Sequence, residues 1–369
     1  MVTLAKHRAR DLAQDYVSLI AGRAVELPGI AAFSNLADFD ASFHQHHQEF
    51  VYPARTANFQ NIGLSRLPPG TVVAAREGYP TFVGDTYIEE QLAPWLIEDE
   101  GRRAQARLPG TPVQVPAGEY LLAARFGEGT WGHWLAEILP RIVVAEHFFP
   151  GRFMFVVPGW TTHLNAGMRA YLESIYAYGI DEARLFRIEE THDYAFESLH
   201  LLDSVWSDRS IHPDVLDLMR NNLPRGVGGV TGYLPARVGI LRKDSARRAI
   251  SNHAEVETFL RANGFLVMEL SDLPFLSQVS LFRNASCVFC VLGSGLTNTL
   301  YSPDHVNVIA PAPEAWGDSF FYPLIQARNG RFADVRGTIT EGDRNRPADS
   351  RFRVDIPTLR RGFEALKLL

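Results

Sequence analysis

The C-terminal third of the chain alternates short apolar runs with amphipathic segments, and this alternation constrains the fold more than any other feature. Runs at 238–242, 265–270, 287–292, 306–311 and 332–335 have the length of strands. Helical spacing occupies 252–262, 274–282 and 320–327, and a short helix is expected from Leu296. Strict alternation of strand and helix predicts an α/β fold with a parallel, doubly wound sheet. Ligands of such sheets bind beyond the carboxyl ends of the strands.

The first half of the chain is less regular. Strands are expected at 71–75, 120–124 and 152–157 and helices at 132–148, 164–176 and 215–221, which fits a second α/β domain behind an irregular segment at 32–66. Residues 221–232 (NNLPRGVGGVTG) hold five glycines or prolines and no apolar period. We therefore place a boundary near residue 225, between domains 1–225 and 226–369. The closing run 358–369 is amphipathic and predicts a helix.

Composition indicates a globular protein that does not bind nucleic acid. Of 369 residues, 46% are hydrophobic and 21% charged, and the formal net charge is −6. The sequence lacks a long uninterrupted apolar run, and its N-terminus lacks the apolar core of a signal peptide, so we expect a cytoplasmic protein. Leu12, Tyr16, Leu19 and Ile20 follow helical spacing beside basic residues. They indicate an ordinary amphipathic helix or, alternatively, one that lies on a membrane surface and gives peripheral association with its inner face.

The only two cysteines, Cys287 and Cys290, form a Cys-x-x-Cys pattern. On a strand, side chains three positions apart point to opposite faces, and no second Cys or His pair lies nearby to complete four ligands. We therefore predict buried structural thiols in place of a metal or redox site.

A small-residue turn follows the third strand of the alternating region. It contains the segment Leu292-Gly293-Ser294-Gly295-Leu296-Thr297-Asn298. A strand that ends in such a turn and opens a helix exposes the N–H groups of the first helical turn, and its glycines let an anion approach the backbone. A phosphate-bearing ligand is the natural occupant; the alternative is a tight turn in which glycine serves geometry alone.

The segment from Trp131 to Arg141 carries titratable residues at every fourth position. His133, Glu137 and Arg141 would share one helical face, with Pro140 as a kink or a helix restart. A His with a carboxylate one turn away is a workable general base, since imidazole titrates near neutrality. The flanking Trp131 and Trp134 offer aromatic faces suited to a sugar or another ring. The alternative is a surface His–Glu pair beside a core helix.

A basic segment follows the first strand of the alternating region. Four cations lie within residues 242–248, among them Arg242 and Arg248, where arginine can grip phosphate bidentately. A solvated run of charge is the alternative. Asn252, with Glu255 three residues on, predicts a helix N-cap, and Gln278 on an otherwise apolar helix predicts a solvent-exposed side chain.

These motifs, in this order, resemble glycosyltransferase family 61. The family's His-Trp-Leu-x-Glu-x-Leu-Pro-Arg helix is matched by His133 to Arg141, and its Arg-(x)5-Arg-x-x-x-Asn segment by Arg242, Arg248 and Asn252. The final motif, a Gln followed by a strand and Gly-[Ala/Ser]-Gly-Leu-Thr-Asn, is matched by Gln278 and by Gly293, Ser294, Gly295, Thr297 and Asn298. The resemblance covers about residues 50–340.

The resemblance implies a GT-B-like fold, with two Rossmann-like domains facing a cleft, and an inverting enzyme without a catalytic metal or other cofactor. The C-terminal domain would bind a nucleotide sugar through Arg242, Arg248, Asn252, Gln278 and the Gly-Ser-Gly turn. The N-terminal domain would bind a glycan or lipid-linked glycan acceptor through Trp131, Trp134 and Arg141, with His133 and Glu137 as catalytic residues. The expected activity is sugar transfer in cell-surface or exported polysaccharide synthesis.

Four positions depart from the family's pattern. Thr130 replaces an Asn, Leu292 a His, His253 a Glu, and Ala310 an acidic residue. These departures keep two alternatives open: a non-catalytic protein that binds nucleotide or glycan, and a GT-B-like sugar-nucleotide epimerase or hydrolase.

Overall fold

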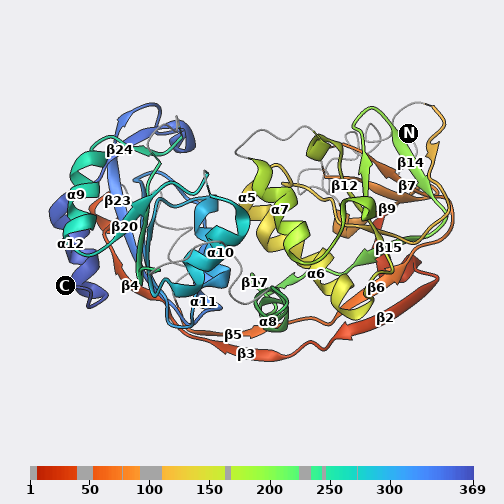
Figure 1. Cartoon of the computed structure of the whole chain (residues 1–369), viewed down its shortest axis with the longest axis horizontal. Coiled ribbons are helices and arrows are strands. Elements are labelled where there is room, and N and C mark those ends of the chain that lie inside the picture. The colour runs from red at the N-terminus through yellow and green to blue at the C-terminus, as the bar shows by residue number, and fades with distance from the viewer. Residues whose placement is uncertain are drawn as a thin grey trace. The chain divides into compact units, whose positions relative to one another are not determined.

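The computed structural model describes residues 6–39, 53–76, 78–91, 110–162, 168–223, 234–242, 247–271 and 273–369 (Figure 1). The chain divides into two compact units. Unit 1 comprises residues 1–23, 58–207 and 212–223, and unit 2 comprises residues 24–57, 208–211 and 224–369. The sequence places its boundary near residue 225, which lies outside the described residues, and assigns residues 24–57 to the first domain. In the structure those residues belong to unit 2.

Unit 2 is built on five parallel strands. They are β18 (Arg237–Ile240), β20 (Leu266–Met268), β21 (Cys287–Cys290), β22 (Asn307–Pro313) and β23 (Arg331–Glu341). Their order across the sheet is β20-β18-β21-β22-β23, and every neighbouring pair is parallel. After β18 the chain adds β20 on one side, and it then adds β21, β22 and β23 on the other side. The topological switch point, where such sheets bind ligands, lies between β18 and β21.

Helices cover both faces of this sheet (Figure 1). One face carries α9 (His253–Ala262) and α12 (Ile356–Ala365); the other carries α10 (Phe275–Asn284) and α11 (Tyr322–Gln326). The 3-10 helix η8 (Ser294–Tyr301) packs against α10 and α11. Phe259 of α9 and Phe363 of α12 pack with Phe289 of β21 in one buried cluster. The predicted doubly wound parallel sheet is therefore confirmed for unit 2.

Further strands extend the edge of this sheet. β24 (Arg351–Arg353) pairs antiparallel with β23, β19 (Ala249–Ile250) pairs with β24, and β4 (Ala31–Ser34) pairs parallel with β23. β3 (Ala24–Leu27) pairs with β5 (Arg55–Asn58). The irregular segment predicted at 32–66 is therefore wrong where it meets β4, β5 and β6 (Ile62–Arg66). These strands are short and pair with partners distant in sequence, which local pattern does not reveal.

Unit 1 contains a second parallel arrangement. β11 (Tyr120–Leu122), β12 (Met154–Pro158), β13 (Leu185–Ile188) and β15 (Leu199–Leu202) lie in the order β13-β12-β11-β15 and are all parallel. The antiparallel strands β6 and β2 (Asp15–Ile20) complete this sheet beyond β15. Its switch point lies between β11 and β15.

A second sheet of unit 1 has the order β1-β9-β8-β7-β14-β10. Its strands are β1 (Lys6–His7), β7 (Thr71–Ala74), β8 (Thr81–Val83), β9 (Thr86–Ile88), β10 (Val113–Gln114) and β14 (Asp193–Phe196). Short elements β16 (Trp206–Ser207), α1 (Ala9–Leu12), α7 (Arg169–Ala177) and α8 (Pro213–Asn221) complete the unit, and β17 (Ser210–Ile211) belongs to unit 2.

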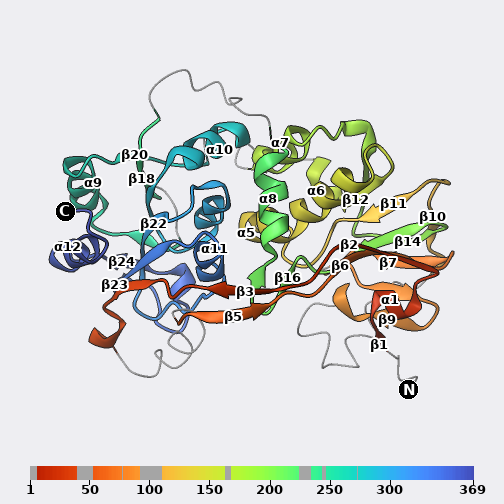
Figure 2. The same ribbon diagram turned by 90° about the horizontal axis from the view of Figure 1, so that it is seen from below.

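The amphipathic helix predicted from Leu12 to Ile20 is wrong. Helix α1 ends at Leu12, and Asp15–Ile20 forms strand β2, which runs beside β6 (Figure 2). Antiparallel pairing with β6 outweighs the weak helical spacing of a segment rich in strand-forming residues. The basis for expecting a helix on a membrane surface is thereby removed. In the described part of the chain, the structure contains no helix with the length and apolar character needed to span a membrane.

The predicted helix at 132–148 is present but changes its winding. It comprises α5 (Trp131–His133), a π-helical turn η4 (Trp134–Ile138) and α6 (Leu139–Phe148). Pro140 stands in the first turn of α6, where its missing N–H is tolerated. Since Pro140 has no N–H to give the carbonyl four residues earlier, the Ala136 oxygen accepts the indole N–H of Trp206 at 2.7 Å. Widened turns of this kind are frequent at functional sites.

Candidate functional site

The switch point of unit 2 brings two arginines onto one glycine. Arg242 follows β18, Arg248 follows a few residues later, and Gly293 follows β21. A Cβ added at Gly293 would lie 3.0 Å from Nη2 of Arg242 and 3.0 Å from Nη2 of Arg248. Two guanidiniums therefore converge on the backbone at the start of η8, in the position where doubly wound sheets bind ligands. A residue with a side chain at position 293 would crowd both guanidiniums, so glycine permits their close approach to the backbone.

Arg248 is held in a costly position. Its φ is +52°, in the left-handed region that residues other than glycine seldom adopt. Its guanidinium carbon lies 4.6 Å from the centre of the Trp316 ring, a cation–π contact. Burial, followed by the charge of Arg242, lowers the pKa of Arg248 to about 10, so it stays charged at neutral pH.

Within the described ranges, neither Arg242 nor Arg248 forms an ion pair with a carboxylate, whereas neighbouring Arg247 binds Asp349 at 3.1 Å. The charges of Asp318 and Asp349 act on Arg248 from a greater distance. Like charges that share a partly buried site favour an anionic ligand, which would relieve their repulsion.

The Gly-Ser-Gly turn has the predicted strand-to-helix geometry. β21 ends at Cys290 and the 3-10 helix η8 begins at Ser294. The N–H groups of Ser294 and Gly295 precede the first bond of this helix, in which the Leu296 N–H donates to the Gly293 carbonyl at 2.9 Å. A Cβ at Gly295 would lie 3.2 Å from the Cys290 sulfur, so this glycine serves packing. Thr297 and Asn298 are fully buried, and the Asn298 amide donates to the Gly295 carbonyl at 3.2 Å. The Thr297 hydroxyl and the Oδ1 atom of Asn298 are buried without a hydrogen-bond partner among the described residues.

Gln278 differs from its predicted position, and Asn252 has the predicted position but a different side-chain contact. Gln278 is buried, not solvent-exposed, and its amide donates to the carbonyls of Leu270 at 3.2 Å and Leu273 at 2.9 Å. It thereby fixes the loop after β20. Asn252 stands at the N-cap position of α9, but its side chain makes no capping bond. It exchanges two hydrogen bonds with the backbone of Val354, because β24 lies within reach.

The two cysteines are buried and free, which confirms the prediction of structural thiols. Burial raises the pKa of both thiols to about 12. They are therefore protonated and unreactive at neutral pH.

The switch point of unit 1 carries the predicted His–Glu pair and a third residue. The Nδ1 atom of His133 lies 2.5 Å from Oε1 of Glu137, and Nη1 of Arg125 lies 2.5 Å from Oε2 of the same carboxylate. Arg125 follows β11, so all three residues lie at the carboxyl end of that strand. Burial raises the pKa of Glu137, but the His133 hydrogen bond and the Arg125 charge outweigh it, and the pKa is lowered overall. Glu137 is thus an ionised carboxylate that orients the imidazole.

Two neighbours restrict this triad. Gly127 has φ +87°, and a Cβ there would lie 2.7 Å from Cγ of His133, so a larger residue would displace the imidazole. Arg141 is fully buried behind Glu137, and burial together with the Arg125 charge lowers its pKa to about 9. Its Nε and Nη1 atoms have no hydrogen-bond partner among the described residues.

The predicted aromatic residues separate into two roles. Trp134 is fully buried, its indole N–H donates to the Ser174 hydroxyl at 2.9 Å, and it packs in the core. Trp131 is half-buried with its ring 5.0 Å from that of Tyr171. Trp134 and Arg141 are fully buried and have no surface to offer a ligand, whereas Trp131 remains partly exposed.

Sequence reasoning missed Arg125 and Trp316. Neither lies in a repeated pattern, and each reaches its partner only through the tertiary fold. Gly127 was missed as well, although the segment before the helix contains two glycines, Gly127 and Gly129, which could have indicated a tight turn beside His133.

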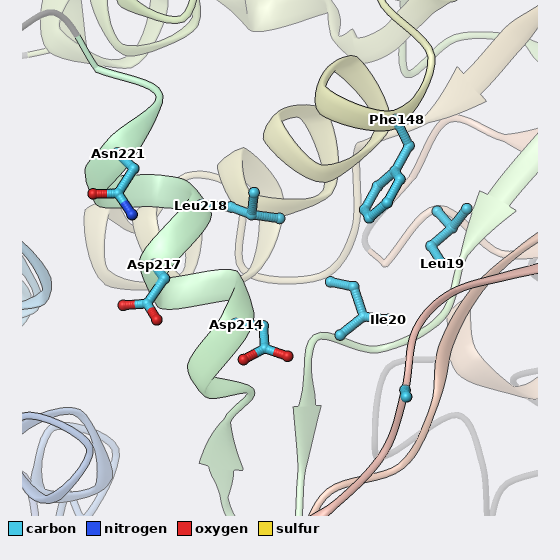
Figure 3. Close-up of a pocket in the computed structure, with 8 residues that line it drawn as sticks. Leu19, Ile20, Phe148, Asp214, Asp217, Leu218 and Asn221 are labelled. Atoms are coloured by element: carbon cyan, nitrogen blue, oxygen red, sulfur yellow. The ribbon is translucent and has the colours of Figure 1, made fainter.

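A hollow of about 410 Å³ elsewhere in unit 1 has a different character (Figure 3). Leu19, Ile20, Phe148 and Leu218 face one another across it, and Asp214, Asp217 and Asn221 lie along α8 at its rim. Asp214 is paired with Arg23 at 2.5 Å. The hollow thus combines an apolar wall with a rim of two carboxylates and one amide.

Within the described ranges, no group of three or more His, Cys, Asp or Glu side chains is arranged to hold a metal ion. The family model Glycosyltransferase 61 matches residues 131–309, a region that includes His133, Arg248 and the Gly-Ser-Gly turn. This match confirms the family resemblance drawn from the motifs. No curated protein matches the chain.

The ionised Glu137 generates a pH-dependent prediction. A carboxylate whose folded pKa is lowered stabilises the fold above its unfolded pKa of about 4.3, and this contribution is lost as the pH falls through the folded pKa. We expect Glu137→Gln to cost about 1–3 kcal/mol at neutral pH, with a smaller cost in acid. Urea unfolding of both proteins at several pH values measures the difference. The exposed Glu197→Gln is the control, and a Glu137→Gln cost that does not change with pH would contradict the assignment.

Proposed function

Because the matched region belongs to glycosyltransferase family 61, we propose that the chain is an inverting glycosyltransferase, which moves a sugar from a nucleotide donor to a glycan acceptor. The observation that carries this proposal is the convergence of Arg242 and Arg248 on Gly293 at the switch point of unit 2. A nucleotide sugar presents a diphosphate, and two guanidiniums that form no ion pair with a described carboxylate suit it.

On the donor side, the diphosphate would bind Arg242, Arg248 and the N–H groups at the start of the Ser294 to Thr297 turn. These donors would stabilise the negative charge that develops on the leaving diphosphate. Gln278, Asn252, Thr297 and Asn298 would act by holding the surrounding loops in place, as their backbone contacts and burial support. The fixed charges let the site work without a divalent ion or another cofactor.

On the acceptor side, His133 would act as the general base. With Nδ1 at Glu137, Nε2 is the nitrogen that would take the acceptor's hydroxyl proton. The acceptor oxygen then forms a bond to the anomeric carbon as the bond from that carbon to the diphosphate oxygen breaks, and its electron pair leaves with the nucleotide. A single displacement of this kind inverts the anomeric centre. Trp131 is the remaining candidate for an acceptor contact near His133.

The proposal places the two sites in the two Rossmann-like domains of a GT-B-like enzyme. Its biological setting would be the synthesis of cell-surface or exported polysaccharide, on the cytoplasmic side of the membrane, with a glycan or a lipid-linked glycan as acceptor. Nucleic acid has no place in it, given the net charge of −6.

One observation favours a second candidate, a binding protein without activity. Leu292 stands where the family has a His and is fully buried, so it offers no donor to a diphosphate. Ala310 lies within β22, opposite Asp334 of β23. The acidic residue that follows the end of β22, Glu314, is paired with Arg344 at 2.9 Å.

A panel of nucleotide sugars with product detection separates the candidates. We expect transfer of sugar to a glycan acceptor, in chelator as well as in added Mg²⁺ or Mn²⁺, because the arginines supply the charge. Donor consumption without transfer would indicate an epimerase or hydrolase, and binding alone would indicate the second candidate. Activity lost in chelator and restored by metal would contradict the metal-independent mechanism.

Arg248 and Arg247 form a matched pair of variants. Arg248→Ala should weaken binding of a nucleoside diphosphate by about 1.5–3 kcal/mol, because a charged hydrogen bond is lost. Arg247→Ala removes an equal charge one position away, already paired with Asp349, and should change affinity little. Calorimetric titration measures both. Equal affinities for the two variants would show that the cluster is a solvated face.

His133→Ala separates chemistry from binding. It should retain donor affinity, since the donor site lies in unit 2, and lower the transfer rate by about a hundredfold or more. It should also flatten the acidic limb of the pH–rate profile, because that limb reports protonation of the base.

The control is His147→Ala, an exposed histidine at the end of the same helix, for which full activity is expected. A His133→Ala variant with a normal transfer rate would exclude His133 as the base. Loss of fold or donor binding would show that its role is structural.

A further inference from the structure

A polar hollow of about 490 Å³ lies in unit 1 outside the triad. Asp203, Ser204 and Trp206 follow the carboxyl end of β15, and Phe59, Gln60 and Asn61 precede β6, the antiparallel neighbour of β15. Arg8, Arg10, Gly22, Glu89, Glu90 and Ser207 complete its lining. Because β11 and β15 are parallel neighbours, this edge of the sheet is the one at which the His133 helix follows β11. The hollow therefore occupies the switch-point position of unit 1.

The hollow offers hydrogen-bonding groups of both kinds. Asp203 accepts hydrogen bonds from the Gly63 N–H and the Tyr16 hydroxyl, both at 2.9 Å and both on Oδ2. Among the described residues Oδ1 has no donor, so it can accept from a ligand. Glu90 accepts from the Ala9 N–H at 3.0 Å. Burial raises the pKa of both carboxyls, a sign that water is partly excluded. Guanidinium and carboxamide groups supply the complementary donors.

The charge of the lining selects against phosphate. Three carboxyl groups, those of Glu89, Glu90 and Asp203, face two exposed arginines. An anionic ligand would be repelled by these carboxylates, whereas the arginine pair of unit 2 would attract it. Mixed donors and acceptors without net positive charge suit the hydroxyl groups of a neutral sugar.

Trp206 provides a fixed aromatic ring in this lining. Its indole N–H donates to the Ala136 carbonyl at 2.7 Å, the acceptor that Pro140 leaves unused. A ring held in place before binding loses little entropy when a ligand packs on it. Aromatic rings of this kind suit the apolar face of a pyranose. Ala136 belongs to the π-helical turn, which follows His133 and contains Glu137. The hydrogen bond therefore joins the Trp206 ring to the helix that carries these two residues.

We propose that this hollow is a carbohydrate subsite, which binds a neutral sugar of the acceptor glycan with Trp206 as its platform and with Asp203, Glu90 and Gln60 as hydroxyl partners. The inference rests on the proposed function, because it names the class of acceptor. It adds a second recognition site beside the proposed base, at which the sugar unit next to the reacting one binds. The hydrogen bond from Trp206 to Ala136 fixes this site relative to the helix that carries His133.

The test is glycan binding by the full chain in the absence of nucleotide. A glycan array of neutral and anionic oligosaccharides, followed by calorimetry with the strongest neutral binder, should show binding of neutral chains. Trp206→Ala should weaken that binding by about tenfold or more, and Trp206→Phe, which keeps a ring, by much less. Gln60→Ala changes an exposed side chain without disturbing the fold and should weaken binding severalfold.

Phe148→Ala, in the apolar hollow of Figure 3, is the matched control and should bind glycan as the unmodified chain does. Absence of neutral-glycan binding on the array would overturn the proposal, as would equal affinities for Trp206→Ala, Gln60→Ala and Phe148→Ala. Because the assay contains no nucleotide, its result is independent of transfer. Glycan binding without transfer from any donor would refute the proposed function alone, and transfer without these affinity losses would refute the subsite alone.

Discussion

The close approach of two arginines to Gly293 is the constraint on which the donor side of the account depends. Arg242 and Arg248 carry like charges, Arg248 adopts a left-handed backbone, and burial lowers its pKa to about 10. Each of these features costs free energy in the unliganded chain. Trp316 beneath the guanidinium offsets part of this cost, and a bound diphosphate would offset more. These costs support the proposal that the site binds an anion.

The same topology organises unit 1, with different chemistry at its switch point. Arg125, Glu137 and His133 form a chain of contacts at the carboxyl end of β11, in which each partner fixes the next. Pro140 sets the winding of the helix that holds them, and the carbonyl it leaves unused is satisfied by Trp206. A backbone irregularity therefore joins the helix of His133 to a neighbouring polar hollow.

Local pattern predicts the parts of this structure that local interactions determine. The alternation at 238–335 predicts the parallel sheet, and the His133–Glu137 spacing predicts their contact, because both depend on periodicity. Strand β2 was missed because its pairing with β6 depends on residues about 45 positions away. Arg141 follows a π-helical turn, which shifts the face that later residues of the helix occupy, and it is fully buried. The residue spacing does not predict that turn. Arg125 and Trp316 reach their partners only in the folded chain.

The most direct test of the central claim is a crystal structure of the chain with a nucleoside diphosphate. The account predicts diphosphate oxygens within hydrogen-bond distance of both the Arg242 and Arg248 guanidiniums, and of at least one N–H in the turn that begins at Ser294. A diphosphate bound elsewhere, or one that leaves both guanidiniums without contact, would contradict it.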